Sequence, residues 1–401
     1  MKRVLFISIY LIFSAMHWVY GYQSEYWAYN NILTLHSGAK WLQPYVCCTS
    51  VEPRESVTYN IPGHSREGGV DWYVTSIDKN AFNGYRCLHS ITIPNSIISI
   101  GKDAFDHTGI YEIDSNWKNG VLYIDSCLIT GRKYKYKYEH CGPYNNIICW
   151  ETTLESVVKG TYSIEEGTRV IADSAFLGCT ELTSIAIPNS VVSIGKGAFS
   201  DTEVYNNESN YENGVLYIGN YLIKAKNELL KGEYTIKDGT IGIAAGAFTG
   251  CSNLTSITLP ESLKFIGDSA FVGTSITSIL LPDSLTIIGE GALDTTPITS
   301  INIPSNVEFI GSYAFYNCDG LTELIIPQTV KKLGADIFAR CDNLVYVELP
   351  FFINKNNGPN VFDCKSLVSV MINGSNECVY IRRIYEFNRF SSITELHQSL
   401  R

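Results

Sequence analysis

The chain has 401 residues, of which 45 % are hydrophobic and 17 % charged, and its formal net charge is −10. This composition excludes an intrinsically disordered chain, because disorder combines low hydrophobicity with a high density of charge. The acidic balance argues against a nucleic-acid partner, since binding to a phosphate backbone needs a cationic surface. Length alone predicts two or three domains of roughly 100–200 residues each, unless the chain is a barrel or a repeat array.

Residues 1–21 have the three parts of a secretory signal peptide in their usual order. Lys2 and Arg3 precede an apolar run, Val4 to Phe13, and small or apolar residues follow at 19–21, where a signal peptidase would cleave. The run is too short for a transmembrane helix, which needs about 20 residues. We therefore expect residues 1–21 to be a cleaved signal peptide. The mature chain would be secreted or displayed at the cell surface, with no transmembrane segment, and loss of the two cations would change its net charge from −10 to −12. The alternatives for this leader are a buried first strand and a membrane anchor.

Residues 22–56 do not match the pattern that follows them. They contain Trp27, Trp41 and the adjacent pair Cys47-Cys48. Because the ends of a stacked array need atypical units to cover the exposed core, we expect this segment to be an N-terminal cap.

An Ala-Phe pair, or a variant of it, recurs along the chain. Its second residue falls at Phe82, Phe105, Phe176, Phe199, Phe248, Phe271, Leu293, Phe315, Phe338 and Phe362. The pair recurs about every 23 residues, a period typical of a solenoid repeat. Only the gaps from Phe105 to Phe176 and from Phe199 to Phe248 are longer. This spacing predicts a solenoid over residues 57–373 with insertions near 113–162 and 204–235.

The repeated unit is well represented by residues 182–199. It opens with Leu-x-x-Ile-x-Ile, whose alternation of apolar and polar residues predicts a short strand with its Ile side chains on one face. A Pro then ends the strand because it lacks an N–H donor, and Asn-Ser or Asp-Ser supplies a turn. A second apolar pair precedes a Gly and the Ala-Phe pair. A single unit cannot bury its apolar face, so stability must come from stacking.

The unit Cys-x-x-Leu-x-x-Ile-x-Ile-Pro-x-Ser-Val-x-x-Ile-Gly-x-x-Ala-Phe resembles the leucine-rich repeat of BspA-like surface proteins, over roughly residues 57–372. The segments opening at Asn119 and Asn213, both reading Asn-Gly-Val-Leu-Tyr-Ile, resemble the longer variant unit of that class. The resemblance implies a leucine-rich repeat solenoid, a right-handed curved array of short parallel strands with few helices. It also implies export and adhesion to host or matrix proteins. Residues 374–401 would be a C-terminal cap or tail.

The two polar positions beside the central Ile of each strand should face the concave surface. Along the chain they are Ser90 and Thr92, Ser184 and Ala186, Ser256 and Thr258, Ser278 and Leu280, Ser300 and Asn302, Glu323 and Ile325, Tyr346 and Glu348, and Ser369 and Met371. Small hydroxyl residues thus give way to larger ones in the last units. Since aromatic and Met side chains are enriched at interfaces, we expect a protein-binding face formed by Glu323, Ile325, Tyr346, Glu348 and Met371. The alternative is that these residues meet a C-terminal cap or another subunit.

The first insertion is longer than the second and carries a basic and aromatic stretch. It extends from Asn119 to Tyr162, whereas the matching span of the second extends from Asn213 to Tyr234. Its candidate binding residues are Lys133, Tyr134, Lys135, Tyr136, Lys137 and Tyr138. As a strand, this stretch would place its cations on one face and its tyrosines on the other. It could bind an acidic partner or a glycan. The alternative is that the lysines protect an exposed edge strand from pairing.

The 12 cysteines fall into two groups. Cys179, Cys251, Cys318 and Cys341 follow the Phe position at one constant spacing, with Cys87 and Cys364 slightly offset. We expect them to be small buried residues in one stacked column. The remaining six are Cys47, Cys48, Cys127, Cys141, Cys149 and Cys378. In an exported protein, Cys141 could pair with Cys127 or Cys149 and close the insertion.

Motifs for catalysis or cofactor binding are missing from the sequence. It has no His-Glu-x-x-His, no Gly-x-Ser-x-Gly and no phosphate-loop glycine pattern. We therefore expect a surface protein that binds extracellular host or matrix proteins, without enzymatic activity, cofactor or metal. The alternatives are a carbohydrate-binding surface protein, which an exposed cluster of Tyr and Trp on one face would favour, and a hydrolase with an unrecognised site.

Overall fold

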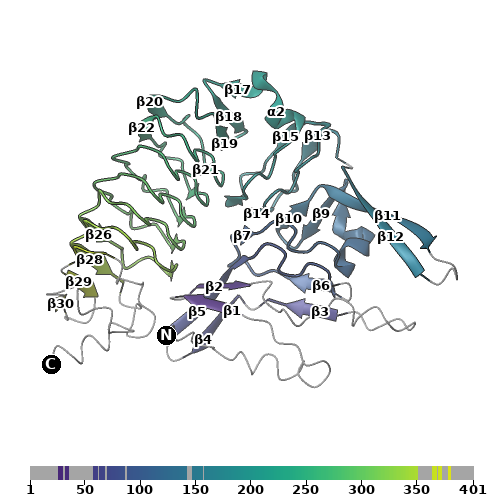
Figure 1. The fold of residues 1–401 in the computed structure, drawn as a ribbon, viewed down its shortest axis with the longest axis horizontal. Coiled ribbons are helices and arrows are strands. Elements are labelled where there is room, and N and C mark those ends of the chain that lie inside the picture. Colours follow the sequence, from purple (N-terminus) through teal and green to yellow (C-terminus); the bar gives the residue numbers. More distant parts are fainter. Residues whose placement is uncertain are drawn as a thin grey trace.

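The chain forms a curved solenoid of about 11 coils in a computed structural model (Figure 1). The described residues are 26–29, 32–35, 57–61, 63–67, 70–85, 88–141, 147–156, 158–350, 364–367, 369–372 and 378–380. The leader expected at 1–21 lies outside them, as do Phe362, Cys47, Cys48 and Cys87. Helix in the described ranges is limited to α2 (Glu203–Asn206) and the 3-10 segments η2 (Gly109–Glu112), η3 (Asp114–Asn116) and η4 (Glu208–Asn210). The curved array of short parallel strands expected from the repeat is confirmed.

Most coils carry a longer strand that contains the Leu-x-x-Ile motif or its equivalent. These strands are β3 (Val57–Asn60), β6 (Leu88–Thr92), β13 (Gly160–Ser163), β15 (Leu182–Ala186), β20 (Gly232–Thr235), β22 (Leu254–Thr258), β26 (Glu323–Ile325), β28 (Tyr346–Leu349) and β29 (Ser369–Ile372). In β22, Leu254 and Ile257 are buried while Thr255 and Thr258 are exposed. The expected alternation is therefore present.

A second strand in each coil, usually of two residues, forms the other ladder. Its members are β5 (Val70–Ile77), β7 (Ser99–Ile100), β14 (Val170–Ile171), β16 (Ser193–Ile194), β21 (Gly242–Ile243), β23 (Phe265–Ile266), β24 (Ile287–Ile288), β25 (Phe309–Ile310) and β27 (Lys332–Leu333). Within this row, β21, β23, β24, β25 and β27 follow one another, and each pairs in parallel with the next. This row is called the inner ladder below.

The two ladders lie on opposite edges of the arc. Figure 1 shows β13, β15, β20, β22, β26 and β28 along the outer edge, and β7, β14 and β21 along the inner edge. The expectation that the longer strands face the concave side is therefore wrong. Hydrogen-bonded strands are about 4.8 Å apart, and a wider outer edge cannot keep that spacing throughout. Accordingly, β13–β15 and β20–β22 are separate pairs, and Ser278 and Ser300 meet only in an isolated bridge.

Glycine permits the close approach of coils at the inner edge. A Gly follows the inner strand in six coils, at Gly101, Gly195, Gly267, Gly289, Gly311 and Gly334. A Cβ on Gly267 would lie 2.6 Å from the Ala245 nitrogen of the preceding coil. The Gly267 N–H donates to the Ile243 carbonyl at 2.9 Å, so a larger residue here would disturb the ladder itself.

The turn that leads into each Ala-Phe pair requires a left-handed residue. The position two before the Phe has φ between 49° and 68° in nine coils, at Asn80, Asp103, Ser174, Gly197, Gly246, Ser269, Gly291, Tyr313 and Asp336. This conformation is uncommon outside Gly, Asn and Asp. It directs the N–H of the residue to the next coil, as from Ser269 to the Glu290 carbonyl at 2.7 Å. The turns thereby form a third row of bonds between coils.

The interior is filled by stacked columns. Phe105, Phe176, Phe199, Phe248, Phe271, Phe315 and Phe338 have at most 1 % of their surface exposed. Neighbouring rings stack, as between Phe248 and Phe271 at 5.3 Å between centroids. The cysteine column is buried too wherever the structure describes it, and its thiols also donate hydrogen bonds. Cys318 donates to the Leu293 carbonyl at 3.1 Å and Cys341 to the Phe315 carbonyl at 3.0 Å.

Two long units replace single coils. The first contains β8 (Trp117–Lys118), β9 (Val121–Ile124) and β10 (Cys127–Thr130), followed by β11 (Arg132–Cys141) and β12 (Ile147–Ser156); the second contains β17 (Tyr211–Glu212), β18 (Val215–Ile218) and β19 (Tyr221–Ala225). In both units an antiparallel pair joins the inner ladder, through β10 to β14 and through β19 to β21. Cys127 sits in β10 as a buried free thiol. Its expected pairing with Cys141 is therefore not present in this structure.

The ends of the array are formed by further strands. β1 (Tyr26–Tyr29) and β2 (Ile32–Leu35) form an antiparallel pair, and β2 pairs in parallel with β5 at the start of the inner ladder. β4 (His64–Glu67) is antiparallel to β5. At the other end, β30 (Cys378–Tyr380) is antiparallel to β29.

The phenylalanine column predicts the effect of truncating one ring. Phe271→Ala should lower the free energy of unfolding by about 3–5 kcal/mol in urea denaturation, because it leaves a cavity between stacked rings. Phe271→Leu should cost less, since Leu293 already occupies the equivalent position. Leu280→Ala, at a side chain that is 77 % exposed, is the control and should change stability by less than about 0.5 kcal/mol. Equal losses for Phe271→Ala and the control would contradict the stacked column.

Candidate functional surface

The five residues expected to form a binding face come together on the outer edge of the last coils. The parallel register pairs Glu323 with Tyr346 and Ile325 with Glu348. It then pairs Glu348 with Met371. The residues therefore occupy neighbouring positions on β26, β28 and β29. We call Glu323, Ile325, Tyr346, Glu348 and Met371 the outer patch.

Contacts within the outer patch orient its central tyrosine. The Tyr346 hydroxyl donates to Glu348 Oε2 at 3.2 Å and lies 3.7 Å from Met371 Sδ. Glu323 is exposed and Ile325 is 45 % exposed, while Tyr346, Glu348 and Met371 are half-buried. The patch thus combines a positioned aromatic ring with an exposed aliphatic side chain and two carboxylates. Such a surface suits a protein partner with apolar and cationic groups.

Two further apolar side chains lie on the outer edge, and neither was among the residues expected to bind. Leu280 is 77 % exposed, and Val345 is 42 % exposed immediately before β28. A signal for Val345 was present in the sequence. The equivalent residue is Thr in the preceding coils, at Thr255, Thr277, Thr299 and Thr322. The change from Thr to Val in this column, at Val345 and again at Val368, marks the same departure from the repeat as the patch itself.

The inner edge of the arc is a packed surface. Side chains of the inner ladder that precede the buried Ile are themselves buried in several coils: Val170 is 0 %, Phe265 1 % and Phe309 7 % exposed. Phe265 lies over Gly242 and 6.1 Å from the Tyr221 ring, measured between centroids. Because these side chains fill the concave side, the outer edge is the better candidate for binding.

The basic and aromatic stretch of the first insertion lies in a two-stranded sheet. β11 pairs only with β12 among the described strands, and Figure 1 shows the pair extending away from the arc. The register matches Tyr134 with Leu154, Tyr136 with Thr152, and Tyr138 with Trp150. It matches Lys133 with Glu155 and Lys137 with Glu151. The backbone register thus sets each of the three tyrosines opposite a residue of β12, with Trp150 opposite Tyr138.

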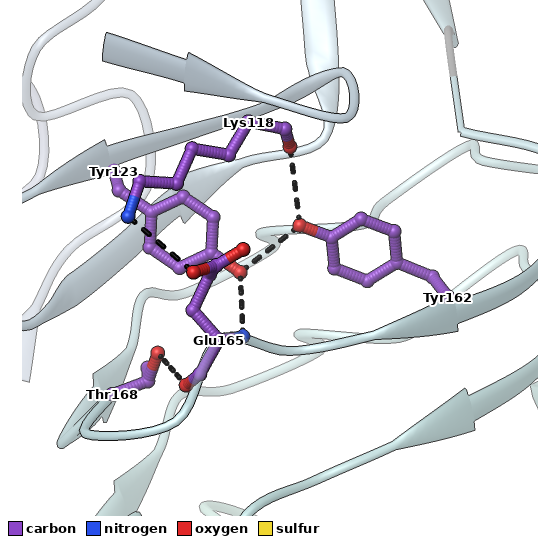
Figure 2. A network of polar contacts seen from close by, with 5 residues as sticks. All are labelled: Lys118, Tyr123, Tyr162, Glu165 and Thr168. Carbon is purple, nitrogen blue, oxygen red and sulfur yellow. Dashed lines mark hydrogen bonds and ion pairs between the residues drawn. The ribbon is translucent and has the colours of Figure 1, made fainter.

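A polar network joins the first long unit to the coil that follows it (Figure 2). The Glu165 N–H donates to the Tyr123 hydroxyl at 3.3 Å, and the two hydroxyls of Tyr123 and Tyr162 are 3.0 Å apart. Tyr162 donates to the Lys118 carbonyl at 3.2 Å, and Lys118 Nζ lies 3.4 Å from Glu165 Oε2. Burial raises the pKa of both tyrosines, so the chain of hydroxyls stays protonated.

The same network recurs in the second long unit with its charges exchanged. The hydroxyls of Tyr217 and Tyr234 are also 3.0 Å apart, and the Lys237 N–H donates to Tyr217 at 3.4 Å. An ion pair joins Lys237 to Glu212. Glu212 stands where the first unit has Lys118, and Lys237 where it has Glu165. The tyrosine pair with two opposite charges beside it is therefore a shared feature of both long units, and we expect it to stabilise them.

Neither a metal cluster nor a membrane-spanning helix is found in the ranges that the structure describes. No three His, Cys, Asp or Glu side chains there could hold a metal ion together. Likewise, none of the helices there is long and apolar enough to cross a bilayer.

Comparison with known proteins identifies the repeat. The family model described as "BspA type leucine rich repeat region" matches six copies, over residues 70–131, 160–232, 226–345 and 286–399. The chain belongs to the BspA-type leucine-rich repeat family. The resemblance of the repeated unit to this family is thereby confirmed. A comparison with curated proteins finds no match.

Several solved structures are similar to this BspA-type chain. A leucine-rich repeat protein from T. pallidum, TpLRR, is 25 % identical, over 38 % of this chain and 75 % of its own, with a TM-score of 0.33. A leucine-rich repeat protein from Bacteroides ovatus is 21 % identical, over 88 % and 76 %, with a TM-score of 0.28. The pneumococcal vaccine antigen PcpA is 16 % identical, over 79 % and 78 %, with a TM-score of 0.30.

The tyrosine network of the long BspA-type unit can be tested by removing one hydroxyl. Tyr162→Phe deprives the buried Tyr123 hydroxyl of its acceptor and should lower stability by about 1–2 kcal/mol in urea denaturation. Tyr234→Phe should act in the same way in the second long unit. Tyr316→Phe is the control, since this change keeps the ring that contacts Arg340 and Tyr313. An unchanged urea midpoint for Tyr162→Phe would show that the network contributes no stability.

Proposed function

We propose that this protein is a secreted or cell-surface binding protein that attaches to extracellular host or matrix proteins through the outer patch, without catalysis. The observation that carries the proposal is the change of the outer strands along the array. Earlier coils present mostly small Ser and Thr side chains at the two positions beside the central Ile, whereas the last coils present Glu323, Ile325, Tyr346, Glu348 and Met371. Membership of the BspA-type family and the leader expected at residues 1–21 support an extracellular location.

The composition of the outer patch supports a protein partner over a small ligand. Interface centres are enriched in aromatic residues and Met, and a few such residues supply most of the binding free energy. The patch offers Tyr346 and Met371 in contact, with Ile325 exposed beside them. The carboxylates of Glu323 and Glu348 would favour a partner segment with cationic side chains. A flat strand surface with these groups fits a macromolecular surface.

The double variant Tyr346→Ala with Glu348→Gln tests this proposal. Binding of the mature chain to a panel of purified extracellular matrix proteins is measured by surface plasmon resonance, and the variant is compared for each protein that binds. Since truncated hot-spot residues cost at least about 2 kcal/mol, affinity should fall by about tenfold or more.

Ser256→Ala with Thr258→Ala supplies the matched control, because these residues hold the same two positions on β22. This pair should leave affinity unchanged. Equal affinity of the outer-patch variant and the unmodified chain would show that the outer patch is not part of the binding surface.

A second function, glycan binding, is favoured by the alternation of Lys and Tyr along β11. In a strand this alternation places Tyr134, Tyr136 and Tyr138 on one face, and the register of β11 with β12 sets Trp150 opposite Tyr138. Aromatic rings at alternate positions of a strand repeat about every 6.8 Å, and they can stack on the apolar faces of successive sugar rings. A sheet of two ten-residue strands covers roughly 34 by 10 Å, well below the ~800 Å² per partner of a stable protein interface.

Replacing the tyrosines separates glycan binding from protection of the sheet edge. The triple variant Tyr134→Ala, Tyr136→Ala, Tyr138→Ala should lose binding on a glycan array, while Lys133→Ala, Lys135→Ala, Lys137→Ala should retain it. If the lysines only prevent strand pairing, the lysine variant will instead aggregate, as light scattering will show, and the tyrosine variant will bind no differently from the unmodified chain.

A further inference from the structure

One column of side chains on the outer edge alternates between apolar and polar residues along five successive coils. We call it the outer row, and its members are Leu280, Asn302, Ile325, Glu348 and Met371. The last three also belong to the outer patch, while the first two lie in the coils before it. The alternation is absent from the two preceding coils, where Thr235 and Thr258 hold the same position.

The outer row points away from the core. Leu280 is 77 % and Ile325 45 % exposed, Asn302 is exposed, and Glu348 and Met371 are half-buried. The residue just before most of them in the chain is buried instead, as at Ile279, Leu324, Val347 and Val370. The row therefore presents three apolar contact points, with one polar side chain between each two.

The distance between the apolar members of the row follows from the spacing of the strands. β26, β28 and β29 pair in parallel, so Ile325 and Met371, which are two strands apart, are separated by about 9.6 Å. Leu280 and Ile325 are also two coils apart. The outer ladder is interrupted between them, where Ser278 and Ser300 meet only in an isolated bridge, and the spacing there is at least as large. Apolar groups thus recur on this surface about every 10 Å.

This interval matches the repeat of an α-helix. Seven residues of helix rise about 10.5 Å and return to the same side of the helix within about 20°. The repeats of extended chains are shorter, at about 6.8 Å for alternate residues of a strand and about 9.3 Å for every third residue of a polyproline helix. Both fall below the distance that two coils impose on the row.

We propose that the outer row docks an amphipathic α-helix of a partner protein, which lies along the row and across the strands. Apolar residues at positions i, i+7 and i+14 of that helix meet Leu280, Ile325 and Met371. A cationic residue midway between the last two meets the Glu348 carboxylate. The inference rests on the function proposed above. It adds the class of the partner segment, and it extends the binding surface by two coils, to Leu280.

Contacts across the arc keep the surface in shape before a partner binds. The Ser99 hydroxyl of β7 donates to Asp268 Oδ2, just after β23, at 3.2 Å. Further along the array, Lys332 Nζ of β27 lies 5.1 Å from the ring centroid of Tyr73 in β5. These contacts join early coils to late ones and oppose a change in curvature. The spacing of the outer row is thereby set in advance, which lowers the cost of binding a rigid helix.

Two helical peptides test the match of spacings. Both have about 21 residues, mostly Ala, Glu and Lys, so that they form helices in water. The heptad peptide carries Leu at i, i+7 and i+14 and a Lys midway between the last two, whereas the control peptide has the same composition with Leu at i, i+5 and i+10. Fluorescence anisotropy measures the binding of each labelled peptide to the mature chain. The heptad peptide should bind at least about tenfold more tightly. Equal affinities, or no binding of the heptad peptide, would overturn the inference.

Variants of the chain separate helix docking from the proposed function. Leu280→Ala lies outside the outer patch and should weaken binding of the heptad peptide by about tenfold. Thr235→Ala, at the same position two coils before Leu280, is the control and should leave this binding unchanged.

Unchanged peptide affinity of Leu280→Ala would overturn helix docking, even where the outer-patch double variant loses its matrix protein. Loss of peptide binding in Leu280→Ala, with matrix-protein binding intact in both variants, would instead overturn the matrix assignment and support the helix site.

Discussion

The spacing of backbone hydrogen bonds at the inner edge is the constraint on which this molecule depends. Each coil must approach the next closely enough for the Gly267 N–H, and its equivalents, to reach a carbonyl of the preceding coil. A side chain at that position would collide with the neighbouring backbone. Because the outer strands are wider apart, their pairing is interrupted, and the array bends towards its glycines. Curvature, the exposed outer strands and the packed interior of the arc all follow from this asymmetry.

Most of the repeat architecture could be predicted from the sequence, because it depends on short-range patterns. Alternation in segments such as Leu254–Thr258 and the period of the Ala-Phe pair specify strands and stacking without any long-range information. The direction of curvature could not be predicted in this way. It depends on which of two ladders is closer packed, and that comparison involves backbones of different coils. An alternation pattern alone therefore assigns the longer strands to the wrong edge of the arc.

The outer patch also combines a feature that the sequence predicts with features that only the structure shows. Its five residues share one face because a parallel register repeats the direction of every side chain from coil to coil, so the sequence was sufficient to group them. The contacts of Tyr346 with Glu348 and Met371 depend on rotamers and needed the structure. Contacts across the arc, such as Ser99 with Asp268, lie beyond any repeat-based argument, since they join coils that are distant in the array.

The exchanged charges of the two tyrosine networks show what the long unit requires at these positions. Lys118 and Glu165 in one long unit correspond to Glu212 and Lys237 in the other, while both tyrosines are kept. Because each pair joins opposite charges although their order is reversed, the attraction between the two sides of a long unit does not depend on which side carries the cation. The long unit therefore sets a rule of charge complementarity at these two positions, and either arrangement satisfies it.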